Sequence, residues 1–92
     1  MTNPHASLQM RVLRAVEELL DDQGPDNRHV DTNMVCHRIQ VEGEQARDEV
    51  AQAMSDLLEE GDVSGKQLRG DNKALDVTVT AITEKGRQLL WR

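Results

Sequence analysis

Apolar residues recur every three or four positions in the first part of the chain, and this spacing predicts an amphipathic helix. The stripe consists of Leu8, Val12, Val16 and Leu19, widened by Leu13 and Leu20. The helix begins either with Pro4 in its first turn or with Ser7 as its cap. Gly24 and Pro25 follow the last apolar residue, which is typical of the end of a helix.

A short extended piece at residues 28–30 is expected to separate this helix from a second one. Asp31 or Thr32 caps the second helix, because either side chain can accept a hydrogen bond from a free backbone N–H. The predicted core-facing residues of this helix are Met34, Val35 and Ile39. Arg38 is expected to point outward, and residues 41–43 form the turn to the next helix.

The third helix is predicted over about 44–60, with Gly61 as a left-handed cap. Its inward face consists of Ala46, Val50, Ala53, Met54, Leu57 and Leu58. A step of roughly 100° per residue defines the opposite face. The residues expected to point furthest outward are Gln45, Asp48, Gln52, Ser55 and Glu59, flanked by Glu44 and Asp56. Arg47, the only base on this helix, is expected nearer the edge of the core.

The hydrophobic period changes to two after residue 62, which predicts a β-hairpin. One strand is expected over 63–68 and a polar turn over 69–73. The second strand buries one face, made of Leu75, Val77 and Val79. Ile82 interrupts the alternation, so the strand is expected to bulge or end there. Thr83 then caps a short last helix that contains Leu89 and Leu90.

This order of elements in a chain of 92 residues predicts one α+β domain over residues 1–92, with its core at about 8–90. Residues 1–6 are expected to be flexible. Seventeen acids against eleven bases give a net charge of −6. This balance argues against loose attraction to nucleic acid or to an anionic membrane. It suits a protein of a very salty cytoplasm, or equally an ordinary acidic bacterial protein.

The remaining chemistry of the chain predicts a cytoplasmic protein without a cofactor. Cys36 is the only cysteine, which fits a reducing compartment, and neither a leader peptide nor a membrane-spanning run is apparent. Cys36 and His37 are neighbours on a helix and point in different directions, so no metal site is expected. Acids such as Glu17 lie on solvated helix faces, and we find no catalytic motif. The protein is therefore not expected to be an enzyme.

Two segments carry a resemblance to a known superfamily. Residues 57–63 combine a double apolar step, two acids and a glycine before the first hairpin strand. Residues 82–90 place a capping threonine before a helix that opens with Lys-Gly. Together with the order of elements, they resemble winged helix-turn-helix domains of bacterial and archaeal transcriptional regulators. The resemblance implies a three-helix core, a β-hairpin wing and a short C-terminal helix.

The resemblance also implies that the protein is a small regulator that binds duplex DNA, with the third helix in the major groove and the wing on the backbone. The implied contacts on the helix are Gln45, Asp48, Glu49, Gln52 and Ser55, and those on the wing are Lys66, Arg69 and Lys73. Arg38 and Arg47 complete the candidate set. The wing cations have an alternative role, which is to prevent pairing at the edge of the hairpin.

The charge of the third helix departs from this pattern. Residues 42–60 hold seven acids against Arg47 alone, and each carboxylate would repel a nearby phosphate. An alternative function is therefore a protein-interaction domain whose acidic third helix docks on a basic partner.

The end of the chain leaves two interpretations of its only aromatic residue. Trp91 either closes the core against the first helix or belongs to a contact between two copies of the chain. The candidate dimer contact consists of Leu8, Leu89, Leu90 and Trp91.

Overall fold

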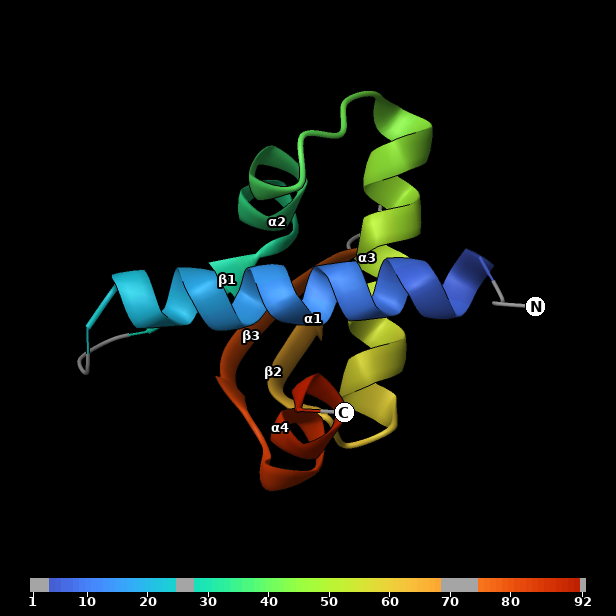
Figure 1. The fold of residues 1–92 in the computed structure, drawn as a ribbon. Helices are drawn as coiled ribbons and strands as arrows, with labels where there is room; N and C mark the ends of the chain where they lie inside the picture. Colours follow the sequence, from blue (N-terminus) through green and yellow to red (C-terminus); the bar gives the residue numbers. More distant parts are fainter. Residues whose placement is uncertain (1–3, 25–27, 69–74, 92) are drawn as a thin grey trace.

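The computed structural model of the protein describes residues 4–24, 28–68 and 75–91. In chain order the elements are α1 (Pro4–Asp22), β1 (Val30–Asp31), α2 (Thr32–Arg38), α3 (Glu44–Glu59), β2 (Val63–Leu68), β3 (Asp76–Ile82) and α4 (Glu84–Leu90). The three strands form one antiparallel sheet in the order β1-β3-β2 (Figure 1). The predicted α+β class is confirmed for these residues, whereas the predicted turn at 69–73 lies outside them.

Helix α1 is the element around which the others pack. It crosses the molecule in front of the sheet and α3 in Figure 1, and it contacts α2, α3, α4, β1 and β3. The core lies between these elements because α1 and α3 both turn an apolar face toward the sheet. Its largest fully buried apolar side chains are Leu13, Met54, Val12, Val16, Val30, Val35, Val50, Val77 and Val79. In the described part of the chain, no helix combines the length and the apolar character needed to cross a bilayer.

The register of the hairpin explains the interrupted pattern near Ile82. Val63 pairs with Ile82 and Gly65 pairs with Val79, but the register shifts between Ser64 and Gly65. The shift leaves Thr80 as the extra residue of β3, which is a β-bulge. An extra residue reverses the alternation of faces, and β3 ends at Ile82, half-buried against the core. The predicted irregularity is therefore confirmed.

The helix ends settle the alternatives at each predicted cap. Helix α1 begins at Pro4, so residues 4–6, which we expected to be flexible, are helical. Asp31 caps α2, because its Oδ1 accepts a hydrogen bond from the Met34 N–H at 2.9 Å. Thr32 is instead buried, and its Oγ1 accepts from the Val77 N–H at 3.1 Å. Two ends are as predicted: Gly61 has a φ of +82°, and Thr83 caps α4.

The extended piece predicted at residues 28–30 is shorter and lies later in the chain. Strand β1 contains only Val30 and Asp31, which pair with Val79 and Thr78 of β3. The strand contains only the residues that pair with β3. Arg28 and His29 precede these residues in the chain and are not part of the strand.

Helix α4 packs its backbone directly on the turn between α3 and β2. A Cβ at Gly86 would collide with the backbone carbonyl of Asp62 and with the Ile82 side chain. The Thr83 hydroxyl donates to the Gly61 carbonyl at 2.6 Å, and the Lys85 ammonium donates to the Glu60 carbonyl at 2.6 Å. The glycine of the Lys-Gly motif is therefore required by close approach of two backbones.

We expect Gly86→Ala to lower the free energy of unfolding by about 1–3 kcal/mol, because the added methyl must displace backbone. Inside a helix, alanine normally raises the free energy of unfolding by about 1 kcal/mol relative to glycine. A decrease in the free energy of unfolding would therefore report the collision. Urea unfolding followed by circular dichroism measures it. Gln88→Ala, at an exposed position of the same helix, is the control and should stay within about 0.5 kcal/mol. An unchanged or raised stability for Gly86→Ala would contradict the packing.

Candidate macromolecule-binding surface

Helix α3 presents a polar face to solvent along its length. We define the α3 acidic face as Gln45, Asp48, Glu49, Gln52, Asp56 and Glu59. All are exposed except Asp56, which is half-buried. Gln52 donates to Asp56 Oδ1 at 3.0 Å and Gln9 of α1 donates to Asp56 Oδ2 at 3.4 Å. The predicted outward positions Gln45, Asp48, Gln52 and Glu59 are confirmed, and the surface that they form carries carboxylates but no base.

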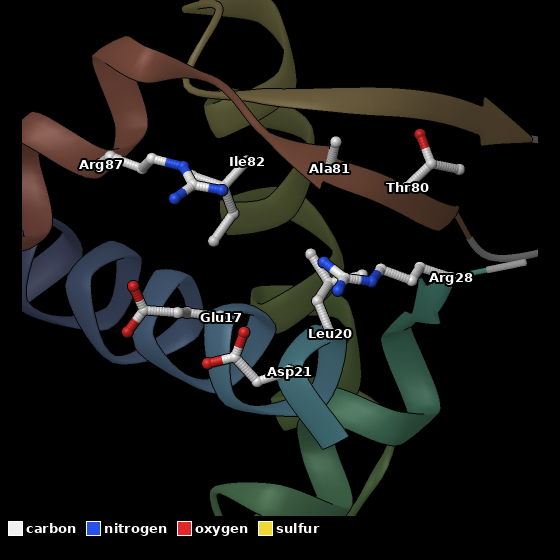
Figure 2. A pocket seen from close by; sticks show the side chains of 8 residues that line it. All are labelled: Glu17, Leu20, Asp21, Arg28, Thr80, Ala81, Ile82 and Arg87. Atoms are coloured by element: carbon white, nitrogen blue, oxygen red, sulfur yellow. The ribbon is translucent and has the colours of Figure 1, made fainter. Parts of the chain in front are cut away.

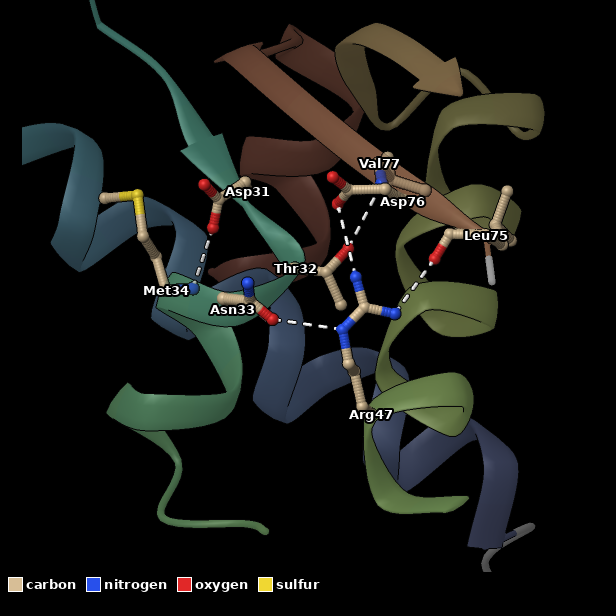
Figure 3. Close-up of polar contacts among 8 residues, drawn as sticks. All are labelled: Asp31, Thr32, Asn33, Met34, Arg47, Leu75, Asp76 and Val77. Carbon is tan, nitrogen blue, oxygen red and sulfur yellow. Dashed lines mark hydrogen bonds and ion pairs between the residues drawn. The ribbon is translucent and has the colours of Figure 1, made fainter. Parts of the chain in front are cut away.

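Arg47 does not extend toward solvent from this helix. Its guanidinium enters the junction between α2, α3 and β3 (Figure 3). Nε donates to Asn33 Oδ1 at 3.0 Å, Nη1 donates to the Leu75 carbonyl at 3.4 Å, and Nη2 lies 4.0 Å from Asp76 Oδ1. The predicted place at the edge of the core is confirmed, and the contacts make Arg47 a structural cross-link.

We expect Arg47→Met to lower the free energy of unfolding by about 1–2 kcal/mol, because it removes the hydrogen bonds and keeps much of the apolar stem. The measurement is urea unfolding at low ionic strength. Arg11→Met, on an exposed position of α1, is the matched control and should have an effect below about 0.5 kcal/mol. Equal effects of the two substitutions would show that the junction contributes nothing to stability.

Arg38 is exposed, as predicted, but its charge is balanced by neighbours on α1. Its Nε lies 3.0 Å from Glu18 Oε2, and its Nη1 lies 3.8 Å from Asp22 Oδ2. These carboxylates lie one helical turn apart on α1 and hold Arg38 between them. An incoming phosphate would therefore meet two acids beside this guanidinium.

Ser55 is buried, so its predicted outward orientation is wrong. Only 4% of the residue is exposed, and its hydroxyl donates to Gln67 Oε1 of β2 at 2.6 Å. Ala51, one turn earlier on α3, is also buried and lies outside the main apolar cluster. Because β2 packs against α3, the helix buries a second face beside the one that meets the core. A serine in that contact is not available to a groove of DNA.

The β2–β3 hairpin contributes one described cation to the candidate set. Lys66 is exposed on β2, opposite Thr78 of β3. Arg69 and Lys73 lie outside the described residues. Among the predicted DNA contacts on α3 and β2, the exposed and described ones are Gln45, Asp48, Glu49, Gln52 and Lys66.

Trp91 does not close the core, so that interpretation is wrong. It follows the last residue of α4 and is 79% exposed. Leu8, Leu89 and Leu90 are half-buried and pack against the core. The contact between two copies of the chain stays a prediction.

The remaining reactive side chains form no site within the described residues. Cys36 packs partly against the core, as predicted. Burial raises the pKa of its thiol, and the nearby Arg47 charge only partly opposes this. The thiol is therefore protonated near neutral pH and a poor nucleophile. Nowhere in the described ranges do three or more His, Cys, Asp or Glu side chains gather in a group that could hold a metal ion.

The sequence interpretation missed a cleft between α1, β3 and α4. It has a volume of about 320 Å³, and four charged side chains line it together with apolar ones. Glu17, which we had interpreted as a solvated helix charge, is half-buried there. Its partners come from segments far apart in the chain, so spacing along the sequence holds no signal for them.

Comparisons of the chain with family models, with curated proteins and with solved structures find no match.

Proposed function

We propose that the protein is a winged-helix domain that binds a basic protein partner through the α3 acidic face. Two features support the winged-helix assignment: the element order and the β2–β3 hairpin beside α3. Helix α3 takes the place of the recognition helix, and the hairpin takes the place of the wing. The proposed binding surface is the helix that contacts DNA in winged-helix regulators, but the proposed partner is a basic protein.

The observation that carries this proposal is that Arg47 of α3 and Arg38 of the neighbouring α2 are already bound by other groups of the chain. Arg47 is held by Asn33, Asp76 and a backbone carbonyl, and Arg38 is held by two acids of α1. Asp48, Glu49 and Glu59 of the α3 acidic face form no ion pair with a base in the described part of the chain. The net field at this surface is therefore negative, and it attracts a cationic surface while it repels phosphate.

The size of the surface suits a partner that docks along the helix. Helix α3 has 16 residues and is therefore roughly 24 Å long at about 1.5 Å per residue. Asp48 and Glu49 lie near its start and Glu59 at its end, so acids line the whole length. A row of lysines or arginines on a partner would meet them at several points.

The experiment is affinity capture from a lysate of the source organism with the purified domain as bait. The captured protein is identified by mass spectrometry, purified and titrated against the domain. The proposal requires a basic partner whose binding weakens as salt is raised. A partner with an acidic binding surface, or binding that is insensitive to salt, would contradict it.

Duplex DNA is the second candidate partner, favoured by exposed Gln45, Gln52 and Lys66. Glutamine can pair with adenine through two hydrogen bonds, and a lysine on the wing can contact phosphate. A gel shift with random-sequence duplex DNA at low salt tests this function. If DNA is the partner, Arg69→Glu together with Lys73→Glu abolishes a salt-sensitive shift. If the protein partner is correct, the wild-type domain gives no shift.

A further inference from the structure

The cleft beside α1 brings together opposite charges from three parts of the chain. It is lined by Glu17, Leu20, Asp21, Arg28, Thr80, Ala81, Ile82 and Arg87 (Figure 2). Helix α1 supplies both acids, the segment before β1 supplies Arg28, and α4 supplies Arg87. Its volume of about 320 Å³ lies at the lower end of the range for small-molecule pockets, about 300–1,000 Å³.

The acids of the cleft lie on one side and the arginines on the other, and within the described ranges the two groups form no ion pairs with each other. Figure 2 shows the carboxylates of Glu17 and Asp21 on the α1 side and the guanidinium groups of Arg28 and Arg87 on the other. None of the ion pairs within 4.0 Å among the described residues joins an acid of this set to an arginine of it. Arg28 donates from Nε to the Gly24 carbonyl, which fixes its position and leaves its terminal nitrogens for another acceptor.

Apolar side chains lie between the two charged walls. Leu20 is 4% exposed, and Ile82 is half-buried against the core. Figure 2 shows the Ile82 side chain between the Arg87 guanidinium group and the carboxylates of α1, and the Leu20 side chain extending from α1 into the cleft. The cleft therefore offers acceptors on one side, donors on the other and an apolar surface between them.

We propose that this cleft binds a free α-amino acid with an apolar side chain. The ammonium group lies against Glu17 and Asp21, and the carboxylate is held by Arg28 and Arg87 through charge-assisted hydrogen bonds. The side chain packs on Leu20 and Ile82. A simple anion would meet the repulsion of the two acids, and a simple cation that of the two arginines. A zwitterion satisfies both walls, and its binding does not depend on the α3 acidic face.

The first experiment titrates the ¹⁵N-labelled domain with L-leucine, L-valine and L-methionine while amide signals are followed by NMR. At least one of the three should shift the signals of Asp21, Ala81 and Ile82 in a saturable way. Two analogues test each charged group: leucinamide lacks the carboxylate, and 4-methylpentanoate lacks the ammonium. Both should bind at least tenfold more weakly than L-leucine. No saturable shift with any of the three amino acids, or equal binding of L-leucine and either analogue, would overturn the proposal.

Substitutions in the cleft provide the second test, with the amino acid that binds best as the probe. Arg87→Gln and Asp21→Asn should each weaken binding at least tenfold, and both positions are exposed, so the fold should be kept. Arg14→Gln, on an exposed position of α1 outside the cleft, is the matched control and should bind as the wild type does. Equal affinity of Arg87→Gln and Arg14→Gln would overturn the assignment of the carboxylate to the arginine wall.

This outcome is separable from that of the proposed function. The variant with Asp48→Lys and Glu49→Lys changes only the α3 acidic face, so it should bind the amino acid with unchanged affinity. A wild-type domain that binds the amino acid but no basic partner would contradict only the proposed function, and one that binds the partner but no amino acid would contradict only the cleft proposal.

Discussion

Asp48→Lys combined with Glu49→Lys is expected to weaken the complex with the captured basic partner by at least ~100-fold. Both side chains are exposed near the start of α3, and no described base balances them. Juxtaposing like charges at an interface costs several kcal/mol, and about 3 kcal/mol corresponds to a ~100-fold change in Kd. The measurement is a titration by isothermal calorimetry at low ionic strength.

A variant with the same total change in charge separates a local contact from the overall field. Asp21→Lys combined with Glu84→Lys reverses two exposed acids on α1 and α4, outside the α3 acidic face and outside the ion pairs of Arg38. This control should weaken the complex by less than ~10-fold, because charges beyond a Debye length are largely screened. Equal losses for the two double variants would mean that only net charge matters and that α3 is not the docking surface.

Leu13→Ala should cause the largest loss of stability, about 3–5 kcal/mol. Leu13 is fully buried on α1, the helix that contacts α2, α3, α4, β1 and β3. Truncation removes its transfer free energy and leaves a cavity that the surrounding elements fill only in part. A domain of this length has a free energy of unfolding of roughly 5–14 kcal/mol, so the loss is a large share of the whole. We expect the midpoint of thermal unfolding to fall by more than 10 °C.

The matched control for this substitution is a leucine that the fold leaves in water. Leu68 ends β2 and is 61% exposed. Leu68→Ala removes the same atoms and should change the free energy of unfolding by less than about 0.5 kcal/mol. Losses of similar size for the two leucines would contradict the placement of α1 at the centre of the core.

Local signals predicted most of the secondary structure. The apolar stripe of α1, the cap at Thr83 and the left-handed glycine at Gly61 each depend on residues within one or two turns. The irregularity near Ile82 was also visible, because an extra residue in a strand reverses the alternation of apolar positions. Spacing along the chain is sufficient for features of this kind.

The errors arise where an element packs on more than one neighbour. A helical wheel assumes one buried face, but α3 meets both the core and β2, so Ser55 was assigned to the wrong side. One of the two interpretations of Trp91 buried it in the core, yet Trp91 is 79% exposed, whereas Leu89 and Leu90 are half-buried against the core. These outcomes depend on which elements lie side by side, and no local pattern contains that information.

The sequence predicted most of the exposed residues of α3, but it did not predict how negative the surface formed by them is. Counting acids and bases identified the excess of carboxylates on α3. Counting alone does not show that Arg47 is held by Asn33 and Asp76, or that Arg38 is held by Glu18. Those contacts join α3 to α2 and β3, and α2 to α1, and they make the exposed face of α3 more negative than composition indicates. The charged cleft was missed for the same reason.

Binding of a basic protein to the α3 acidic face can be observed residue by residue in an NMR titration of the ¹⁵N-labelled domain with the purified partner. We predict that the largest shifts occur at the amides of Gln45, Asp48, Glu49 and Gln52, and that Asp48→Lys with Glu49→Lys removes them. If the largest shifts occurred on α1 or α4 and those four amides did not shift, α3 would not be the docking surface.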